Sequence, residues 1–169
     1  MNEPTVLPPS VRTKDEEPSP TSNDRLWDAI NDRLLPPAAK LAWVKRAAVS
    51  AMIEDHHQLA VEKNWYTPEE EADIFDTVWK KLLLVVGEIS EATEELRAGR
   101  GFDEIYEGPK GKPEGFLVEL ADAVIRINDI VGLLERLGHL KNNPAFGAVI
   151  DQKHAFNATR PARHGGKKA

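Results

Sequence analysis

The segment at residues 118–134, VELADAVIRINDIVGLL, constrains the fold of this chain more than any other stretch. It is long enough for a helix and apolar around most of its circumference, which is typical of a buried helix. At about 100° per residue, Glu119, Asp122 and Arg126 fall within one sector of roughly 60°. Carboxylates on a buried helix need a compensating cation, because an unpaired charge is costly in a low dielectric.

A second acidic stripe lies upstream, in GEISEATEELRAG at residues 87–99. Glu88, Glu91 and Glu95 fall within a similarly narrow sector of a helix, whereas Glu94 lies outside it and is expected at the surface. Acids make up 28 of 169 residues, so a single Glu-x-x-Glu is expected by chance. The stripe becomes informative only together with the acids of the later segment.

Two helices joined by one loop are expected to be antiparallel neighbours, so the two stripes could face each other. They would then form a cage of carboxylate oxygens, which suits Mg²⁺ or Mn²⁺. The predicted ligands are Glu88, Glu91, Glu119 and Asp122. A di-iron site is disfavoured, because such bundles use Glu-x-x-His and the fourth residue here is Glu or Asp. The alternative is that both stripes are solvent faces, with Arg126 paired to Asp122 or Asp129.

The remaining pattern predicts an all-α fold, a four- to five-helix bundle formed by a single domain over residues 23–169. Residues 1–22 hold five prolines and are expected to be disordered. Residues 101–115 are expected to form a long loop and residues 157–169 a basic tail. The expected helices cover residues 23–35, 38–64, 67–97 and 113–137, with a last one from 144.

Local signals support these helix ends. Thr67, Pro68 and Glu70 form a capping-box start, and Gly99 and Gly138 are expected stops. The last helix is expected to start with Asn143 as its cap and Pro144 at its first position.

Composition excludes several classes of protein. The chain has no cysteine, so it has neither disulfides nor thiolate ligands. A net charge of −6 argues against a nucleic-acid binder. No apolar run could span a bilayer and no signal peptide is visible, so we expect a cytoplasmic protein. Residues 152–169 carry basic residues and no acid, which indicates an anionic partner or, alternatively, a solvated tail.

In order and spacing, these motifs resemble the MazG-like nucleotide pyrophosphohydrolases of the all-α NTP pyrophosphatase superfamily, in particular their phage and bacterial branch. The resemblance rests on Glu88-Ile-Ser-Glu91 and Glu119-Leu-Ala-Asp122, with the PEG at 113–115 before the second motif and IRIND after it. HQLAVEKNW at 57–65 and KHAFNATRPARHGGK at 153–167 resemble further family segments. Asn64 stands where relatives tend to carry Gly. The resemblance covers about residues 50–169.

The resemblance implies Mg²⁺-dependent hydrolysis of an NTP or dNTP to NMP and pyrophosphate, a nucleotide-pool housecleaning reaction, and a homodimer or higher homo-oligomer. Mn²⁺ is an alternative cation. Glu91 is the expected general base, which would orient the attacking water. The expected substrate-binding residues are Arg126, Lys153, Asn157, Arg160, His164, Lys167, His57, Lys63 and Trp65.

Several of these residues have a plainer interpretation. Arg126 could be a structural partner of an acid, His57 a helix-surface histidine, and Trp65 a core residue. For the whole chain, the alternatives to an enzyme are a non-catalytic nucleotide- or metal-binding module of the same fold and a purely structural helical protein. The four motif acids with basic residues downstream favour the enzyme.

Overall fold

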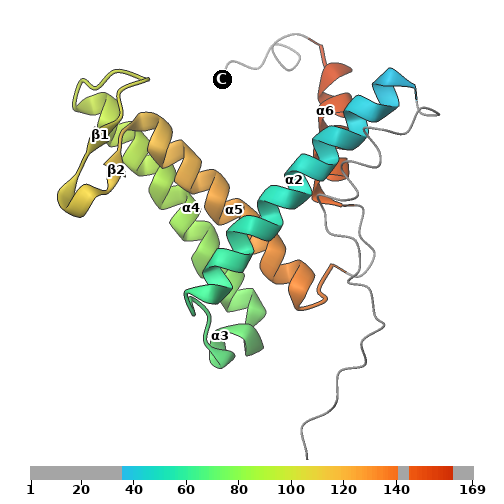
Figure 1. Cartoon of the computed structure of the whole chain (residues 1–169), viewed down its shortest axis with the longest axis horizontal. Coiled ribbons are helices and arrows are strands. Elements are labelled where there is room, and N and C mark those ends of the chain that lie inside the picture. The colour runs from blue at the N-terminus through green and yellow to red at the C-terminus, as the bar shows by residue number, and fades with distance from the viewer. Residues whose placement is uncertain (1–35, 141–144, 162–169) are drawn as a thin grey trace, which may run out of the picture.

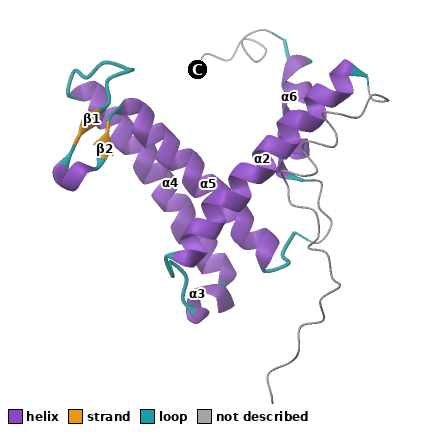
Figure 2. Cartoon of the chain, viewed as in Figure 1, coloured by secondary structure: helices purple, strands orange, loops and turns teal. Residues whose placement is uncertain are grey.

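The computed structural model describes residues 36–140 and 145–161. These residues are predominantly helical, so the all-α prediction is confirmed (Figures 1 and 2). The elements are α2 (Pro37–Glu62), α3 (Pro68–Ala72), α4 (Ile74–Arg97), β1 (Tyr106–Glu107), a 3₁₀ turn (Pro109–Gly111), β2 (Pro113–Glu114), α5 (Phe116–Arg136) and α6 (Phe146–Ala158). The segments predicted at 1–22 and 23–35 and the start predicted at Asn143 and Pro144 lie outside the described residues. Within the described ranges, no helix combines the length and hydropathy needed to cross a membrane.

Helices α4 and α5 form an antiparallel pair, α2 crosses α5, and α6 packs on α2 (Figure 1). Small side chains let the helices approach closely, and Ala92 and Ala123 are both buried. Gly132 has the same effect where α2 crosses α5, because a Cβ there would lie 2.4 Å from the Cβ of His57. The core continues through Ile53 of α2 and Leu133 of α5.

The helix predicted at 67–97 is two helices, because the chain breaks at Asp73. The capping box at Thr67 and Glu70 is present, so the predicted start is confirmed. At Asp73, however, φ is −106° and ψ is 72°, and its side chain accepts a hydrogen bond from the Asp76 N–H at 3.2 Å. Asp favours such caps because its carboxylate satisfies an N–H that has no partner within the helix. This local cap breaks the helix at a point where the apolar spacing alone predicts a continuous helix.

The segment predicted as a loop contains a small β-hairpin. Tyr106 pairs with Glu114, and Glu107 with Pro113, in an antiparallel arrangement. The strands have two residues each, too short for an alternating pattern to reveal them. Gly115 then adopts φ 133° and α5 begins at Phe116, three residues later than predicted. A side chain at Gly115 would meet the Glu104 carbonyl oxygen at 2.3 Å, so this position needs glycine.

The predicted helix ends at Gly99 and Gly138 are confirmed, since both glycines adopt positive φ just beyond a helix. The expectation that α5 is buried around most of its surface is wrong for a single chain. Ile130 and Leu133 are buried, but Leu117 and Val124 are exposed. The physical reason is that α2 and α4 cover only two sides of α5.

Candidate metal centre

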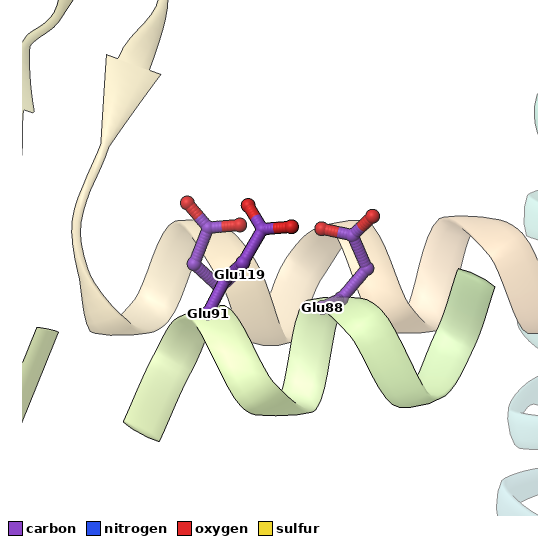
Figure 3. A group of neighbouring side chains, drawn as sticks. All are labelled: Glu88, Glu91 and Glu119. Carbon is purple, nitrogen blue, oxygen red and sulfur yellow. The ribbon is translucent and has the colours of Figure 1, made fainter. Parts of the chain in front are cut away.

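Three carboxylates meet between α4 and α5 near the hairpin. Glu88 and Glu91 come from α4 and Glu119 from α5, and one oxygen of each lies within 4.8 Å of the others (Figure 3). We call these three residues the acidic cluster. They are three of the four ligands predicted from the sequence. Asp122, half-buried three residues further along α5, does not belong to this group.

Helix geometry explains why these three side chains meet. Glu88 and Glu91 are three residues apart and therefore project from one side of α4. Glu119 lies in the first turn of α5, where the helix dipole favours a negative charge. Because the two helices run antiparallel, the first turn of α5 lies opposite the second half of α4 (Figure 3).

The members of the acidic cluster differ in burial and in partners. Glu88 is 6 % exposed and accepts a hydrogen bond from Arg126 Nε to its Oε1 at 2.5 Å. Glu119 is only 2 % exposed, and its Oε2 is buried without a hydrogen-bond partner among the described residues. Glu91 is exposed. A buried carboxylate oxygen without a partner is costly, so this position is suited to a cation.

The electrostatics of Glu119 reflect that burial. Desolvation is the main cause that raises the pKa of Glu119 to about 7, while Lys112 acts in the opposite direction. Repulsion from Glu91 and proton-sharing contacts with Glu114 and Glu88 raise this pKa further. The acidic cluster therefore holds more negative charge than its surroundings compensate.

The donor set fits a hard divalent cation. All potential ligands are carboxylate oxygens, which Mg²⁺, Mn²⁺ and Ca²⁺ prefer. Oxygens around a Mg²⁺ at about 2.1 Å lie at most about 4.2 Å apart, so a small convergence of the side chains would suffice. Waters or a substrate would complete the coordination, because three carboxylates leave positions open.

Glu95, the third acid of the stripe on α4, contacts the hairpin. Its Oε1 accepts a hydrogen bond from the Tyr106 hydroxyl at 2.9 Å, and its Oε2 is buried without a partner among the described residues. Glu94 is exposed, which confirms the predicted surface position, and it pairs with Arg97. Arg126 is a structural partner of an acid, but that acid is Glu88 on the other helix. Neither Asp122 nor Asp129, the partners considered from the sequence, is its ion-pair partner.

The predicted phosphate-binding residues near the C-terminus lie away from the acidic cluster. Lys153 and Asn157 are on α6, and Arg160 follows its end. Figure 1 shows α6 packed on α2 at the opposite end of the molecule from the hairpin. The Lys153 ammonium lies 5.2 Å from the centre of the Phe156 ring on the same helix. His164 and Lys167 lie outside the described residues.

His57 is buried, so the helix-surface interpretation is wrong. Its Nδ1 lies 2.8 Å from Asp129 Oδ1, and Arg136 Nε donates to its Nε2 at 2.9 Å. With Nε2 accepting, the His57 proton lies on Nδ1 and is donated to Asp129. His56 also reaches α5, where its Nδ1 lies 3.1 Å from the Asn128 side-chain nitrogen. Both neighbouring histidines thus contact one helix.

Asp129 is the centre of this second polar group. Tyr66 OH donates to Oδ1 at 2.5 Å and Lys81 Nζ to Oδ2 at 2.8 Å. Burial alone would raise the pKa of Asp129, but the hydrogen bonds from Lys81, Tyr66 and His57 hold it below its usual range. Burial and the bond to Asp129 raise the pKa of Tyr66 far above its usual value. We call Asp129, His57, Tyr66 and Lys81 the Asp129 cluster.

The chain turns at Asn64, and the two predicted binding residues beside it are exposed. Asn64 adopts φ 54°, the left-handed conformation that Gly favours and Asn tolerates. Lys63 caps the end of α2, and Trp65 is 59 % exposed, so Trp65 is not a core residue in one chain. Neither residue belongs to the acidic cluster.

Sequence reasoning missed two residues beside the acidic cluster. Lys112 and Glu114 lie in the hairpin, and their side chains form an ion pair at 3.3 Å. Helical periodicity does not extend into this segment, so no spacing relates them to Glu119. The available signal was the PEG at 113–115, which contains Glu114 but was given no role in the site.

Comparison with protein-family models, with curated proteins and with solved structures finds no match for this chain.

Proposed function

We propose that this protein hydrolyses a nucleoside triphosphate to a nucleoside monophosphate and pyrophosphate, using Mg²⁺ bound by the acidic cluster. The observation that carries the proposal is the buried Oε2 of Glu119, which has no hydrogen-bond partner in the described ranges and lies beside two further carboxylates. A hard cation would satisfy this oxygen and offset the three charges. The reaction itself follows from the resemblance of the two acidic motifs to the MazG-like family.

The residues of the site can have separate roles in this reaction. Bound Mg²⁺ would polarise the phosphoryl group and lower the pKa of a coordinated water. Glu91 is exposed, so its carboxylate can reach a water and accept its proton as a general base. Arg126 bonds to Glu88 through Nε. Its two terminal nitrogens have no hydrogen-bond partner among the described residues and can donate to a phosphate oxygen. Burial keeps Glu119 in place as a fixed ligand.

The test is a panel of NTPs and dNTPs with Mg²⁺, in which pyrophosphate and orthophosphate are measured separately. Wild-type protein should release pyrophosphate, and Glu119→Gln should abolish this release because it removes a ligand charge. Glu94→Gln, which changes an exposed acid of α4, the helix that carries Glu88 and Glu91, is the matched control and should retain activity. Orthophosphate as the only product, or activity that survives Glu119→Gln, would refute the proposal. Saturable nucleotide binding without turnover would instead identify the non-catalytic module.

We also propose that the chain self-associates through α4. An apolar stripe follows the side of α4 that faces away from the core, and its members are all exposed: Phe75, Trp79, Leu82, Leu83, Val86 and Ile89. Large exposed apolar patches of this kind mark interfaces. Exposed apolar residues of α5, Leu117 and Val124 among them, add to the uncovered area.

Sedimentation velocity over a range of protein concentrations tests this interface. Val86→Glu should shift the protein to the monomer, because it places a charge in the centre of the stripe. Leu41→Glu, at an exposed apolar position of α2, is the control and should leave the distribution unchanged. A wild-type protein that stays monomeric at all concentrations would contradict this part of the proposal.

A further inference from the structure

The β-hairpin holds a lysine beside the acidic cluster. Lys112 precedes β2, and the Gly108 N–H donates to its carbonyl oxygen at 2.7 Å, which fixes the backbone of the turn. The Tyr106 hydroxyl attaches the hairpin to Glu95 of α4. At the other end, β2 leads directly into α5 through Gly115. In Figure 3 this strand descends to the start of α5 beside Glu91 and Glu119.

Glu114 links Lys112 to the acidic cluster. Its Oε2 accepts from Lys112 Nζ at 3.3 Å. The Glu114 carboxyl group also raises the pKa of Glu119, which places it beside the acidic cluster. Gly108 makes room for this side chain, because a Cβ there would lie 2.6 Å from Glu114 Cγ. Consistent with this placement, the carboxylates of Glu114, Glu119 and Glu91 all raise the pKa of Lys112.

A triphosphate at the acidic cluster needs positive charge beyond a divalent cation. The three carboxylates already exceed the charge of one such ion, and Arg126, although its terminal nitrogens can reach one phosphate oxygen, already has its charge paired with Glu88. The lysine and arginine predicted on and after α6 lie at the other end of the molecule (Figure 1). The Lys112 side chain is half exposed and ends in a flexible ammonium, so it can exchange Glu114 for a phosphate oxygen without a change in the backbone.

We propose that Lys112 is a substrate-binding residue that contacts the phosphate chain of a nucleotide whose metal is held by the acidic cluster. This assignment rests on the proposed function, since it presumes a phosphorylated substrate at that cluster. It gives the hairpin a role, namely to carry a cation to the edge of a strongly acidic site.

Binding of an α,β-imido nucleoside triphosphate with Mn²⁺ tests the assignment without requiring turnover. Lys112→Met should weaken this binding about ten-fold or more, because a charge-assisted hydrogen bond is lost. Lys112→Arg should retain most of the affinity. Lys110→Met removes the same charge from the same turn and, as the matched control, should stay within about two-fold of wild type. Binding of Mn²⁺ alone, followed by electron paramagnetic resonance, should be unchanged or tighter in Lys112→Met.

The outcomes separate this assignment from the proposed function. If Lys112→Met binds the imido nucleotide as Lys110→Met does, the assignment is wrong even where wild-type protein releases pyrophosphate. If Lys112→Met weakens nucleotide binding but wild-type protein has no turnover, the assignment holds and the proposed reaction fails. Wild-type protein that binds no nucleotide overturns both. Circular dichroism and the melting temperature of each variant show whether the fold is retained.

Discussion

Replacement of Glu119 by Gln should change how stability depends on pH when no divalent cation is present. In the folded protein the pKa of Glu119 is raised from 4.5 to about 7, mainly by burial. The folded state therefore binds this proton more tightly than the unfolded chain does. The resulting contribution to stability is complete below pH 4.5 and is lost as the pH rises through 7.

The magnitude follows from the size of the shift. One pKa unit corresponds to about 1.4 kcal/mol, so the free energy of unfolding should fall by at most about 3.5 kcal/mol from this group. For a chain of this size that corresponds to a decrease in melting temperature of roughly 7–14 °C. Gln has nearly the same shape and no charge, so Glu119→Gln should lack this loss and be the more stable protein at pH 8.

Urea unfolding at several pH values between 5 and 8, in the presence of EDTA, measures the difference. The comparison between the two proteins isolates Glu119, because the other titrating groups are common to both. A saturating concentration of Mg²⁺, about 100 times its dissociation constant, should restore roughly 2.7 kcal/mol to wild type and nothing to Glu119→Gln. Parallel pH profiles for the two proteins would refute the reasoning, as would equal stabilisation by Mg²⁺.

Two further substitutions, each with a control, test the contacts between helices. Gly132→Ala should destabilise the protein by about 1–3 kcal/mol although Ala favours helix, because the new methyl group would meet the buried histidine of α2. Gly87→Ala, with no atom within 4 Å, is the control in thermal unfolding and should stabilise by up to about 1 kcal/mol. Asp129→Asn should cost about 3–5 kcal/mol in urea unfolding, because it leaves Lys81 without its charge partner in a largely buried place. Asp76→Asn breaks an exposed ion pair and should cost less than about 1 kcal/mol, so equal losses for the two variants would contradict the argument.

Periodicity predicted the parts of the site that lie on helices. Glu88, Glu91 and Glu119 were identified because residues three apart share a helix face, and the structure brings them together. The same rule correctly placed Glu94 at the surface, outside the sector of the other acids of α4. Asp122 satisfies the rule as well, yet it is not in the group, because a shared face does not fix how far along the interface a side chain reaches.

Contacts between segments distant in sequence could not be read from periodicity. Arg126 has two acids near it on its own helix, but its partner is Glu88 on α4. Likewise, Asp129 receives hydrogen bonds from His57 and Tyr66, more than sixty residues away. Which of several possible partners a charge selects depends on how the helices dock, and one sequence does not define that geometry.

Irregular segments set the other limit. The hairpin that carries Lys112 has strands of two residues, which are too short to show the alternation of apolar and polar residues that identifies a strand. The break at Asp73 arises from a single side chain that caps the following helix. Local chemistry of this kind overrides a continuous apolar stripe, and it becomes visible only when the backbone is known.

The two ends of the interface between α4 and α5 differ in how they are held, and this should appear in amide hydrogen exchange. Asp129 lies ten residues from Glu119, roughly 15 Å along α5. At the Asp129 end both carboxylate oxygens have partners, whereas at the Glu119 end one buried oxygen has none within residues 36–140 and 145–161. Without a cation, the first turns of α5 and the hairpin should open by local fluctuation while the later turns stay protected. Bound Mg²⁺ would slow amide exchange at the Glu119 end only. Binding of the cation should therefore be detectable as increased protection in one half of a single helix.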